Sequence, residues 1–387
     1  MTEIQKGVIT LIKSAIDKKS YPLQEGFSIE EALDFIIEHR AMMPAYDGAV
    51  RCGIPKNLPA MQKLLRLYII GMIKSEKQLD AVGKIYTAFD ENGIDYLPLK
   101  GCNMKHLYPK PELRAMGDAD ILIRERQLSM VSEVLEKTGF EQEDEMDHHS
   151  GWCSDSLHLE IHRKPFSISN REFFEYYGDG WKFAKNAEKH RFVFSPEDEF
   201  IYIFTHFAVH CRCGGIGLRH AVDFYVYKNA YKNLDEEYIK KELEKLQLLR
   251  LYKNMKNLIS AWFDGEEFSE EAKVLSDFIF SGGDWGSYSN SFLSLEVKNR
   301  KNAGEEESSK IKSLIRIIFQ PLTLMQVKYI KLQKYPVLLP FYWVKRWFEV
   351  LLFRRKNIVK KAEMLQKIDE NKIAEYEEMM RKTGIRE

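Results

Sequence analysis

The stretches that decide the fold are Leu97-Pro98-Leu99-Lys100-Gly101 and Arg114-Ala115-Met116-Gly117-Asp118-Ala119-Asp120-Ile121-Leu122-Ile123. The apolar run that ends at Ile123 is rich in β-branched residues and has no helical period, which predicts a strand. Side chains two residues apart on a strand point to the same face, so Asp118 and Asp120 are expected side by side. Adjacent carboxylates repel each other unless a cation or a proton compensates them. The pair therefore predicts part of a metal site.

A third acidic ligand is expected on the segment Ser156-Leu157-His158-Leu159-Glu160-Ile161-His162, whose polar and apolar residues alternate as in a half-buried strand. This alternation puts Glu160 and His162 on one face. Three oxygen ligands without a thiolate suit Mg²⁺ or Mn²⁺ better than zinc. The alternative is that Asp118 caps a turn and Glu160 is a solvated charge on an edge strand, but the two strands together favour the metal site.

Several motifs in this region resemble the uncharacterised nucleotidyltransferase family of the polymerase β-like nucleotidyltransferase superfamily. The motifs are Leu99-Lys100-Gly101, Tyr108-Pro109, Arg114, Gly117-Asp118-Ala119-Asp120, Leu135 with Gly139-Phe140, and Leu159-Glu160-Ile161-His162. The resemblance implies an α+β fold with a mixed-sheet nucleotidyltransferase core and helices around it. A weaker resemblance continues from Ser195 to Asp223.

The resemblance also implies an activity, in which a nucleoside monophosphate moves from a nucleoside triphosphate to an acceptor with release of pyrophosphate. Asp118 and Asp120 would bridge two metal ions, Mg²⁺ or Mn²⁺, and Glu160 would hold the ion nearer the acceptor. His162 is the fourth catalytic candidate, because the family motif carries Glu-x-His there. Lys100, Gly101 and Arg114 would bind the nucleotide phosphates. The acceptor, whether a small molecule, a sugar or a protein, is not implied.

The turn Lys100-Gly101-Cys102 lacks the hydroxyl that many active superfamily members carry there. Lys100 can replace it as a point charge, and the Arg114 fork matches phosphate oxygens. The alternative for Lys100 is a surface charge at a strand end. A non-catalytic nucleotide-binding or scaffold module is therefore the second hypothesis, and a kinase-like or phosphohydrolase site is the third. Asparagine at position 118 or 120 is expected to abolish transfer and to leave the metal-free protein equally or more stable.

Composition excludes some classes of protein. Lys+Arg and Asp+Glu are both 58, so the formal net charge is zero, which argues against a nucleic-acid partner. The five cysteines are scattered and predict no disulfide framework. The N-terminus shows no apolar h-region, and we expect no signal peptide and a cytoplasmic location.

The pattern of helix and strand signals predicts four regions. These are a helical N-terminal region (1–92), the nucleotidyltransferase core (93–194), a helical domain (195–282) and a basic, aromatic-rich helical C-terminal region (283–387). Within the last region, Lys298–Lys310 has no apolar period and is expected to be mobile.

Two further features of the sequence each allow more than one interpretation. His206 and His210 lie four residues apart in a predicted helix, with Cys211, Cys213 and His220 nearby, and are either core histidines, part of a cleft wall before Asp223, or zinc ligands. The segment 311–361 has twelve basic residues and one acidic residue, Glu349, interleaved with aromatic residues. It either packs its aromatic face on the protein body, which we favour, or makes a peripheral contact with an anionic membrane.

Overall fold

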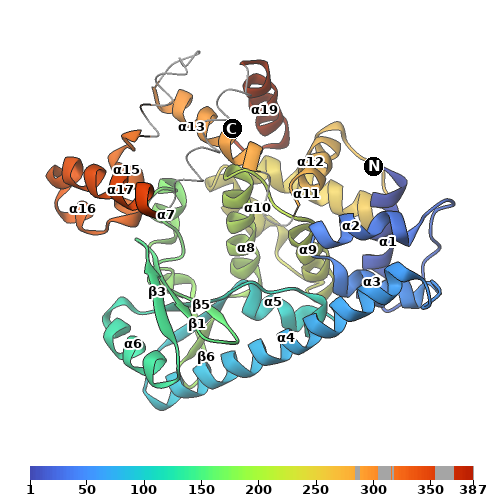
Figure 1. The fold of residues 1–387 in the computed structure, drawn as a ribbon, viewed down its shortest axis with the longest axis horizontal. Helices are drawn as coiled ribbons and strands as arrows, with labels where there is room; N and C mark the ends of the chain where they lie inside the picture. Colours follow the sequence, from blue (N-terminus) through green and yellow to red (C-terminus); the bar gives the residue numbers. More distant parts are fainter. Residues whose placement is uncertain (284–287, 304–314, 316–317, 354–369, 387) are drawn as a thin grey trace.

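The computed structural model describes residues 1–283, 288–303, 315, 318–353 and 370–386 (Figure 1). Its centre is one seven-stranded sheet in the order β3-β4-β5-β2-β1-β7-β6. The strands are β1 (Tyr96–Leu99), β2 (Ala119–Ile123), β3 (Glu141–Glu145), β4 (His149–Cys153), β5 (His158–His162), β6 (Lys185–Glu188) and β7 (Arg191–Val193). Helices surround this sheet, so the chain has an α+β fold, as the sequence predicts.

The sheet is mixed. β2 lies between β5 and β1. It pairs parallel with β5 and antiparallel with β1. β4 pairs antiparallel with both β3 and β5, and β1 pairs parallel with β7. The two strands predicted to carry the carboxylates are therefore neighbours at the centre of the sheet.

The two faces of the sheet belong to different cores. Ala119, Ile121, Leu159 and Ile161 point into a core that includes side chains of α4 (Pro59–Glu91) and α6 (Leu128–Lys137). Leu97, Leu99 and Leu122 point the other way, into a larger core shared with the helices that follow the sheet. Because side chains alternate along a strand, Asp120 and Glu160 lie on the second face.

The N-terminal residues are helical, as predicted: α1 (Glu3–Asp17), α2 (Ile29–Glu38), α3 (Met42–Arg51) and α4. Ser28 caps α2 by accepting from the Glu31 N–H. The 33-residue α4 contributes Ala60, Met61 and Leu64 to the N-terminal side of the larger core and Val82, Ile85 and Phe89 to the core under the sheet. This one helix thus links the N-terminal helices to the sheet, as Figure 1 shows.

Helices also dominate the chain after β7. They are α8 (Pro196–Arg212), α9 (Leu218–Ala230), α10 (Glu236–Lys245), α11 (Leu249–Ile259) and α12 (Glu270–Ser281), whereas the shorter α5 (Gly101–Leu107) and α7 (Arg171–Tyr177) come earlier, between strands of the sheet. The predicted caps are confirmed, because Ser195 accepts from Asp198 N–H and Asp235 accepts from Tyr238 N–H. α8 and α9 stand over the carboxylate-bearing face of the sheet.

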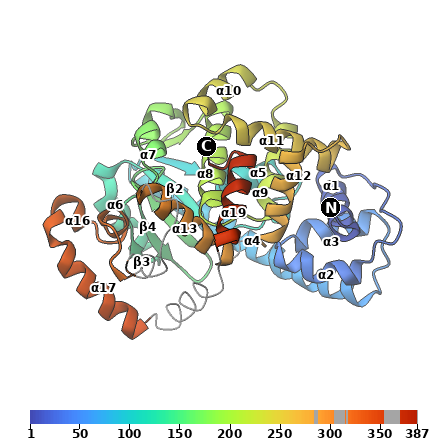
Figure 2. The ribbon, with the colours of Figure 1, turned by 90° about the horizontal axis from the view of Figure 1, so that it is seen from above.

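The C-terminal part contains α13 (Tyr288–Ala303), α15 (Leu322–Lys328), α16 (Lys331–Lys334), α17 (Leu339–Phe353) and α19 (Glu370–Thr383). Residues 298–303 continue α13 and 304–310 lie outside the described residues, so the expected mobility of Lys298–Lys310 stays a prediction. Figure 2 shows α16 and α17 at one edge of the molecule.

The expectation that the aromatic residues of 311–361 pack on the protein body is wrong in part. Trp343 and Trp347 are half-buried and make edge-to-face contacts with Phe319 of the same region, whereas Phe348 is 63% exposed. Among the described residues, no helix combines the length and the apolar character needed to span a bilayer. No disulfide joins the five cysteines, all of which are described.

Candidate functional site

Strand register brings the predicted carboxylates together. Asp120 of β2 lies directly opposite Glu160 of β5, and Leu122 lies opposite His162. The Nε2 atom of His162 lies 3.0 Å from Asp120 Oδ1 and 3.1 Å from Glu160 Oε2. Asp120 and His162 are each 2% exposed, so this cluster is buried at the floor of the site.

Asp118 precedes β2 and lines the same cavity of about 160 Å³ as Asp120 and Glu160. Burial raises the pKa of the Asp118 carboxyl above its ordinary value, and the negative charges of Asp120 and Glu160 raise it further. The three predicted acidic residues therefore share one site, on one side of one sheet.

Lys100 neutralises part of this charge. Its Nζ lies 2.6 Å from Asp120 Oδ1, and its side chain is only 15% exposed. Burial alone lowers the pKa of Lys100, but the charge of Asp120 outweighs burial and raises it, so the ammonium stays charged. Lys100 sits at the turn between β1 and α5 with φ +44° and ψ −113°, a region that side-chain-bearing residues rarely adopt. Such strain persists where the surroundings fix a functional side chain.

His162 lies between the two strand carboxylates. Burial alone lowers the pKa of His162, but its hydrogen bonds to Asp120 and Glu160 raise the value above the ordinary one. The same bond to His162 helps lower the pKa of Glu160 against the opposing effect of burial. The other ring nitrogen, Nδ1, is buried and has no hydrogen-bond partner among the described residues.

Arg114 lies at the cavity wall, paired with an acidic side chain. Its Nε and Nη2 donate to Asp223 Oδ1 and Oδ2, both at 2.8 Å, and Tyr108 donates its hydroxyl to Asp223 Oδ1 at 2.7 Å. The bidentate fork predicted for phosphate thus faces a carboxylate of α9. The Nη1 atom, outside this pair, is the atom that a side chain at Gly101 would meet, at 3.0 Å. A side chain at Gly101 would therefore crowd the Arg114 guanidinium.

Histidines of α8 and α9 form the opposite wall. His206, His210 and His220 line the cavity together with the carboxylates, which agrees with the cleft-wall hypothesis. Burial lowers the pKa of all three, that of His210 to about 4, so they are neutral at pH 7. The Nε2 atoms of His206 and His210 lie 3.3 Å apart, but within the described residues neither Cys211 nor Cys213 joins them in a three-ligand group.

Two histidines that sequence reasoning missed belong to the same site. His149 of β4 lies opposite His162 in the antiparallel register, and its Nε2 is 3.8 Å from Glu160 Oε1. The ligand atoms of His148, His149 and His162 lie within 4.8 Å of one another. The only sequence signal was the run Asp147-His148-His149 just before the Glu160 strand, and the pairing of β4 with β5 cannot be seen in that run.

The residues present fit a divalent cation. Asp120, Glu160 and His162 offer ligand atoms within 4.8 Å of one another, and Asp118 adds a carboxylate to the same cavity. The hydroxyl of Tyr202, on α8, is buried and has no hydrogen-bond partner within the described part of the chain. Burial raises the pKa of Tyr202, and the nearby charge of Lys100 opposes this effect. Unpartnered buried polar atoms around a charged cluster are typical of a site that takes a polar ligand.

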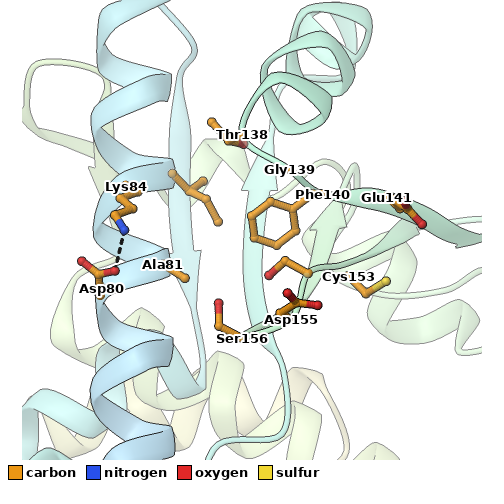
Figure 3. Close-up of a pocket in the computed structure, with 12 residues that line it drawn as sticks. Asp80, Ala81, Lys84, Thr138, Gly139, Phe140, Glu141, Cys153, Asp155 and Ser156 are labelled. Carbon is orange, nitrogen blue, oxygen red and sulfur yellow. Dashed lines mark ion pairs between the residues drawn. The ribbon is translucent and has the colours of Figure 1, made fainter.

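A larger cavity lies elsewhere. It has a volume of about 710 Å³ and lies between α4, the start of β3 and the turn between β4 and β5 (Figure 3). Its lining includes Ile85 and Phe140, which belong to the core on the face of the sheet opposite to Glu160. None of the predicted site residues lines it, so size alone does not identify the site of chemistry.

Lys105, which contacts Arg114 of the carboxylate site, provides a test of packing through the pH dependence of stability. Burial, with the charge of Arg114, lowers the pKa of Lys105 from 10.5 to about 8, and its Nζ donates to the Arg114 carbonyl at 3.0 Å. Between pH 8 and 10.5 the unfolded chain binds a proton that the folded chain has lost, so stability rises with pH. Relative to Lys105→Met, the wild type should gain about 3 kcal/mol across this window in urea denaturation.

The control for this experiment is Lys84→Met on the exposed side of α4, where the lysine side chain is 72% exposed. This variant should differ from the wild type by less than about 0.5 kcal/mol throughout. A wild type that runs parallel to Lys105→Met from pH 8 to 10 would show that the buried lysine remains protonated.

Comparison with known proteins gives one match. A family model described as uncharacterised nucleotidyltransferase matches residues 25–264, which include both carboxylate strands, Lys100 and the α8–α9 wall. No curated protein and no solved structure matches the chain. Because the family model spans more than half of the 387 residues, this chain belongs to the uncharacterised nucleotidyltransferase family.

Proposed function

We propose that this protein is a metal-dependent nucleotidyltransferase with a polymerase β-like core. It would transfer a nucleoside monophosphate from a nucleoside triphosphate to an acceptor and release pyrophosphate. The observation that carries the proposal is the register of β2 with β5, which sets Asp120 opposite Glu160 in the cavity that Asp118 also lines.

Asp118, Asp120 and Glu160 would hold Mg²⁺ or Mn²⁺. A bound divalent ion neutralises triphosphate charge and polarises the attacking oxygen. In the metal-free protein Lys100 supplies the positive charge next to Asp120, at 2.6 Å. We expect the Lys100 ammonium to turn from Asp120 to a phosphate oxygen when nucleotide and ion bind, because both then compete for the same partners.

The transfer step forms a bond between the acceptor oxygen and the α-phosphorus and breaks the bond between the α-phosphorus and the bridging oxygen to the β-phosphate. The electron pair of the broken bond leaves with pyrophosphate, and the acceptor proton is lost to the solvent. His162 positions Asp120 and Glu160 through its Nε2 bonds. The Nη1 atom of Arg114, directed at Gly101, would face the phosphates while Nε and Nη2 hold Asp223.

Nucleoside triphosphates labelled at the α- or the γ-phosphate distinguish the hypotheses. With Mn²⁺ and a panel of sugar phosphates, polyols and protein, we expect the α-label on one acceptor and the γ-label in pyrophosphate. Release of inorganic phosphate would instead indicate a phosphohydrolase, and transfer of the γ-label would indicate a kinase. Tight binding of an α,β-methylene analogue, together with no turnover of the labelled triphosphates, would favour the non-catalytic module. The missing turn hydroxyl at Lys100-Gly101-Cys102 also favours that module.

A further inference from the structure

A chain of hydrogen bonds fixes the tautomer of His149. The Asp147 carboxylate accepts from Ser167 Oγ at 2.9 Å and from the Ile168 N–H at 2.8 Å, and His148 Nδ1 lies 2.9 Å from its other oxygen. A carboxylate only accepts, so His148 Nδ1 donates to it. The Nε2 of neutral His148 is then an acceptor, and His149 Nδ1, 3.1 Å away, is its donor. This leaves the lone pair of His149 on Nε2.

That lone pair lies at the carboxylate site. His149 Nε2 is 3.8 Å from Glu160 Oε1, while His162 Nε2 is 3.0 Å from Asp120 Oδ1. Ligand atoms bound to one ion at about 2.1 Å lie about 3.0 Å apart at right angles and about 4.2 Å apart when opposite. The separation of His149 Nε2 and Glu160 Oε1 falls within this range, so one ion can contact both atoms.

We propose that His149 is a ligand of the divalent ion in this site and that its imidazole selects a first-row transition ion such as Mn²⁺ over Mg²⁺. The proposal rests on the metal site of the proposed function. Imidazole suits transition ions, whereas Mg²⁺ takes oxygen ligands and water. Asp147, acting through His148, is the positioning residue, since the second ring nitrogen of a metal-binding histidine is generally held by such a partner.

Metal binding to the full-length protein tests this without nucleotide. We expect Mn²⁺, followed by electron paramagnetic resonance, to bind the wild type at least tenfold more tightly than Mg²⁺ measured by competition. His149→Ala should weaken Mn²⁺ binding by about 10–100-fold and Mg²⁺ binding by less than about threefold. Spin-echo modulation from nitrogen bound to Mn²⁺ should be present in the wild type and weaker in His149→Ala.

The matched control is His158→Ala on β5, whose side chain is 54% exposed and pairs with Glu143 away from the cluster. It should keep wild-type Mn²⁺ affinity. His149→Asn serves as the second variant if the alanine variant does not fold. Unchanged Mn²⁺ preference and unchanged nitrogen modulation in the folded variant would overturn the proposal. Absence of nucleotidyl transfer in a protein with these metal properties would count against the proposed function alone.

A second inference concerns the exposed apolar side chains of α17 and the turn before it. Val337, Phe341, Val344 and Phe348 are 83%, 66%, 44% and 63% exposed. The last three lie at i, i+3 and i+7 on α17, so they share one face of that helix. The helix is held from its other side, where Trp343 Nε1 donates to the Gln320 carbonyl at 2.8 Å and Tyr342 packs around the buried Met325 and Leu332. Residues 318–353 therefore form a unit that packs on one side of α17 and leaves this apolar face exposed.

Basic residues outnumber acidic ones in the segment that carries this face. Residues 318–353 contain the basic residues Lys328, Lys331, Lys334, Lys345 and Arg346. Their one acidic residue, Glu349, forms an ion pair with Lys328. The unit meets the protein body where the Asp147 N–H donates to the Val327 carbonyl at 3.0 Å, next to the chain that leads to His149.

We infer that this apolar face, Val337, Phe341, Val344 and Phe348, docks on an anionic lipid surface, since a segment with an excess of basic residues and exposed aromatic side chains matches such a surface. Full-length protein should bind vesicles with about 30% phosphatidylglycerol in phosphatidylcholine at low salt, and 0.5 M salt should weaken binding as the charges are screened. Phe341→Ser with Phe348→Ser should reduce binding at least tenfold.

Ile70→Ser with Ile73→Ser is the matched control, because these α4 side chains are 62% and 46% exposed outside the basic unit. It should bind vesicles like the wild type. No vesicle binding by the wild type at low salt would overturn the inference. So would a wild-type dimer in sedimentation that the Phe341/Phe348 variant turns into a monomer, because the occupant would then be a second copy of the chain.

Discussion

Asp118→Asn and Asp120→Asn are expected to abolish nucleotidyl transfer equally while changing the stability of the metal-free protein in opposite directions. Loss of either carboxylate should lower the transfer rate by at least about 10³-fold, equivalent to about 4 kcal/mol of transition-state stabilisation. The reason is that each removes negative charge from the site proposed to hold the divalent ion. Rates with Mn²⁺ and a labelled triphosphate measure this effect.

The two variants are expected to differ in the stability of the metal-free protein. Asp118 is a buried carboxyl with a raised pKa beside Asp120, so its neutral replacement relieves repulsion, and the melting temperature should stay equal or rise. Asp120 holds Lys100 at 2.6 Å and His162 at 3.0 Å. Removing its charge leaves a nearly buried ammonium without its partner, and we expect a loss on the order of 3 kcal/mol. We therefore keep the expectation of equal or higher stability for Asp118→Asn and revise it for Asp120→Asn.

Asp155→Asn provides the control, because Asp155 lines the larger cavity of Figure 3 and not the carboxylate site. It should keep full transfer activity and wild-type stability. Activity that survives at Asp118→Asn or Asp120→Asn, or is lost at Asp155→Asn, would remove the assigned roles.

Asp223→Ala is expected to have the largest effect on stability. It leaves the Arg114 guanidinium, 7% exposed, without the carboxylate that accepts two of its hydrogen bonds. Breaking one side of a buried pair costs about 3–5 kcal/mol, whereas replacing both partners with apolar side chains is often close to neutral. Arg114→Met with Asp223→Leu should therefore recover most of the loss in urea denaturation.

The double variant also tests the phosphate role expected for Arg114. If Arg114 only ties the segment before β2 to α9, the stabilised double variant should bind an α,β-methylene triphosphate like the wild type. If Nη1 contacts a phosphate, affinity should remain at least tenfold lower although stability has returned. Asp80→Asn, at an exposed pair with Lys84 on α4, is the control and should change stability by less than about 0.5 kcal/mol.

Local sequence predicted the elements whose physical cause is local. Ser28, Ser195 and Asp235 cap helices because their side-chain oxygens satisfy N–H groups within three residues. Alternation in Leu157–His162 predicted β5 because one of its faces is buried. In contrast, β3 is a fully exposed Glu141–Glu145 strand without apolar alternation, and it forms because β4 offers it a hydrogen-bonding edge. No signal within those five residues predicts that edge.

For the site, the sequence by itself determined that Asp118 and Asp120 are near each other and that Glu160 and His162 share a strand face, since strand periodicity fixes these relations. Only tertiary structure decided that β2 lies beside β5, that Lys100 rests on Asp120, that Arg114 pairs with Asp223, and that His149 joins the cluster. Those contacts depend on strand register and on helix packing between residues far apart in the chain. A side chain carries no local record of its partner across a sheet, because that partner is set by which strands pair and in which register.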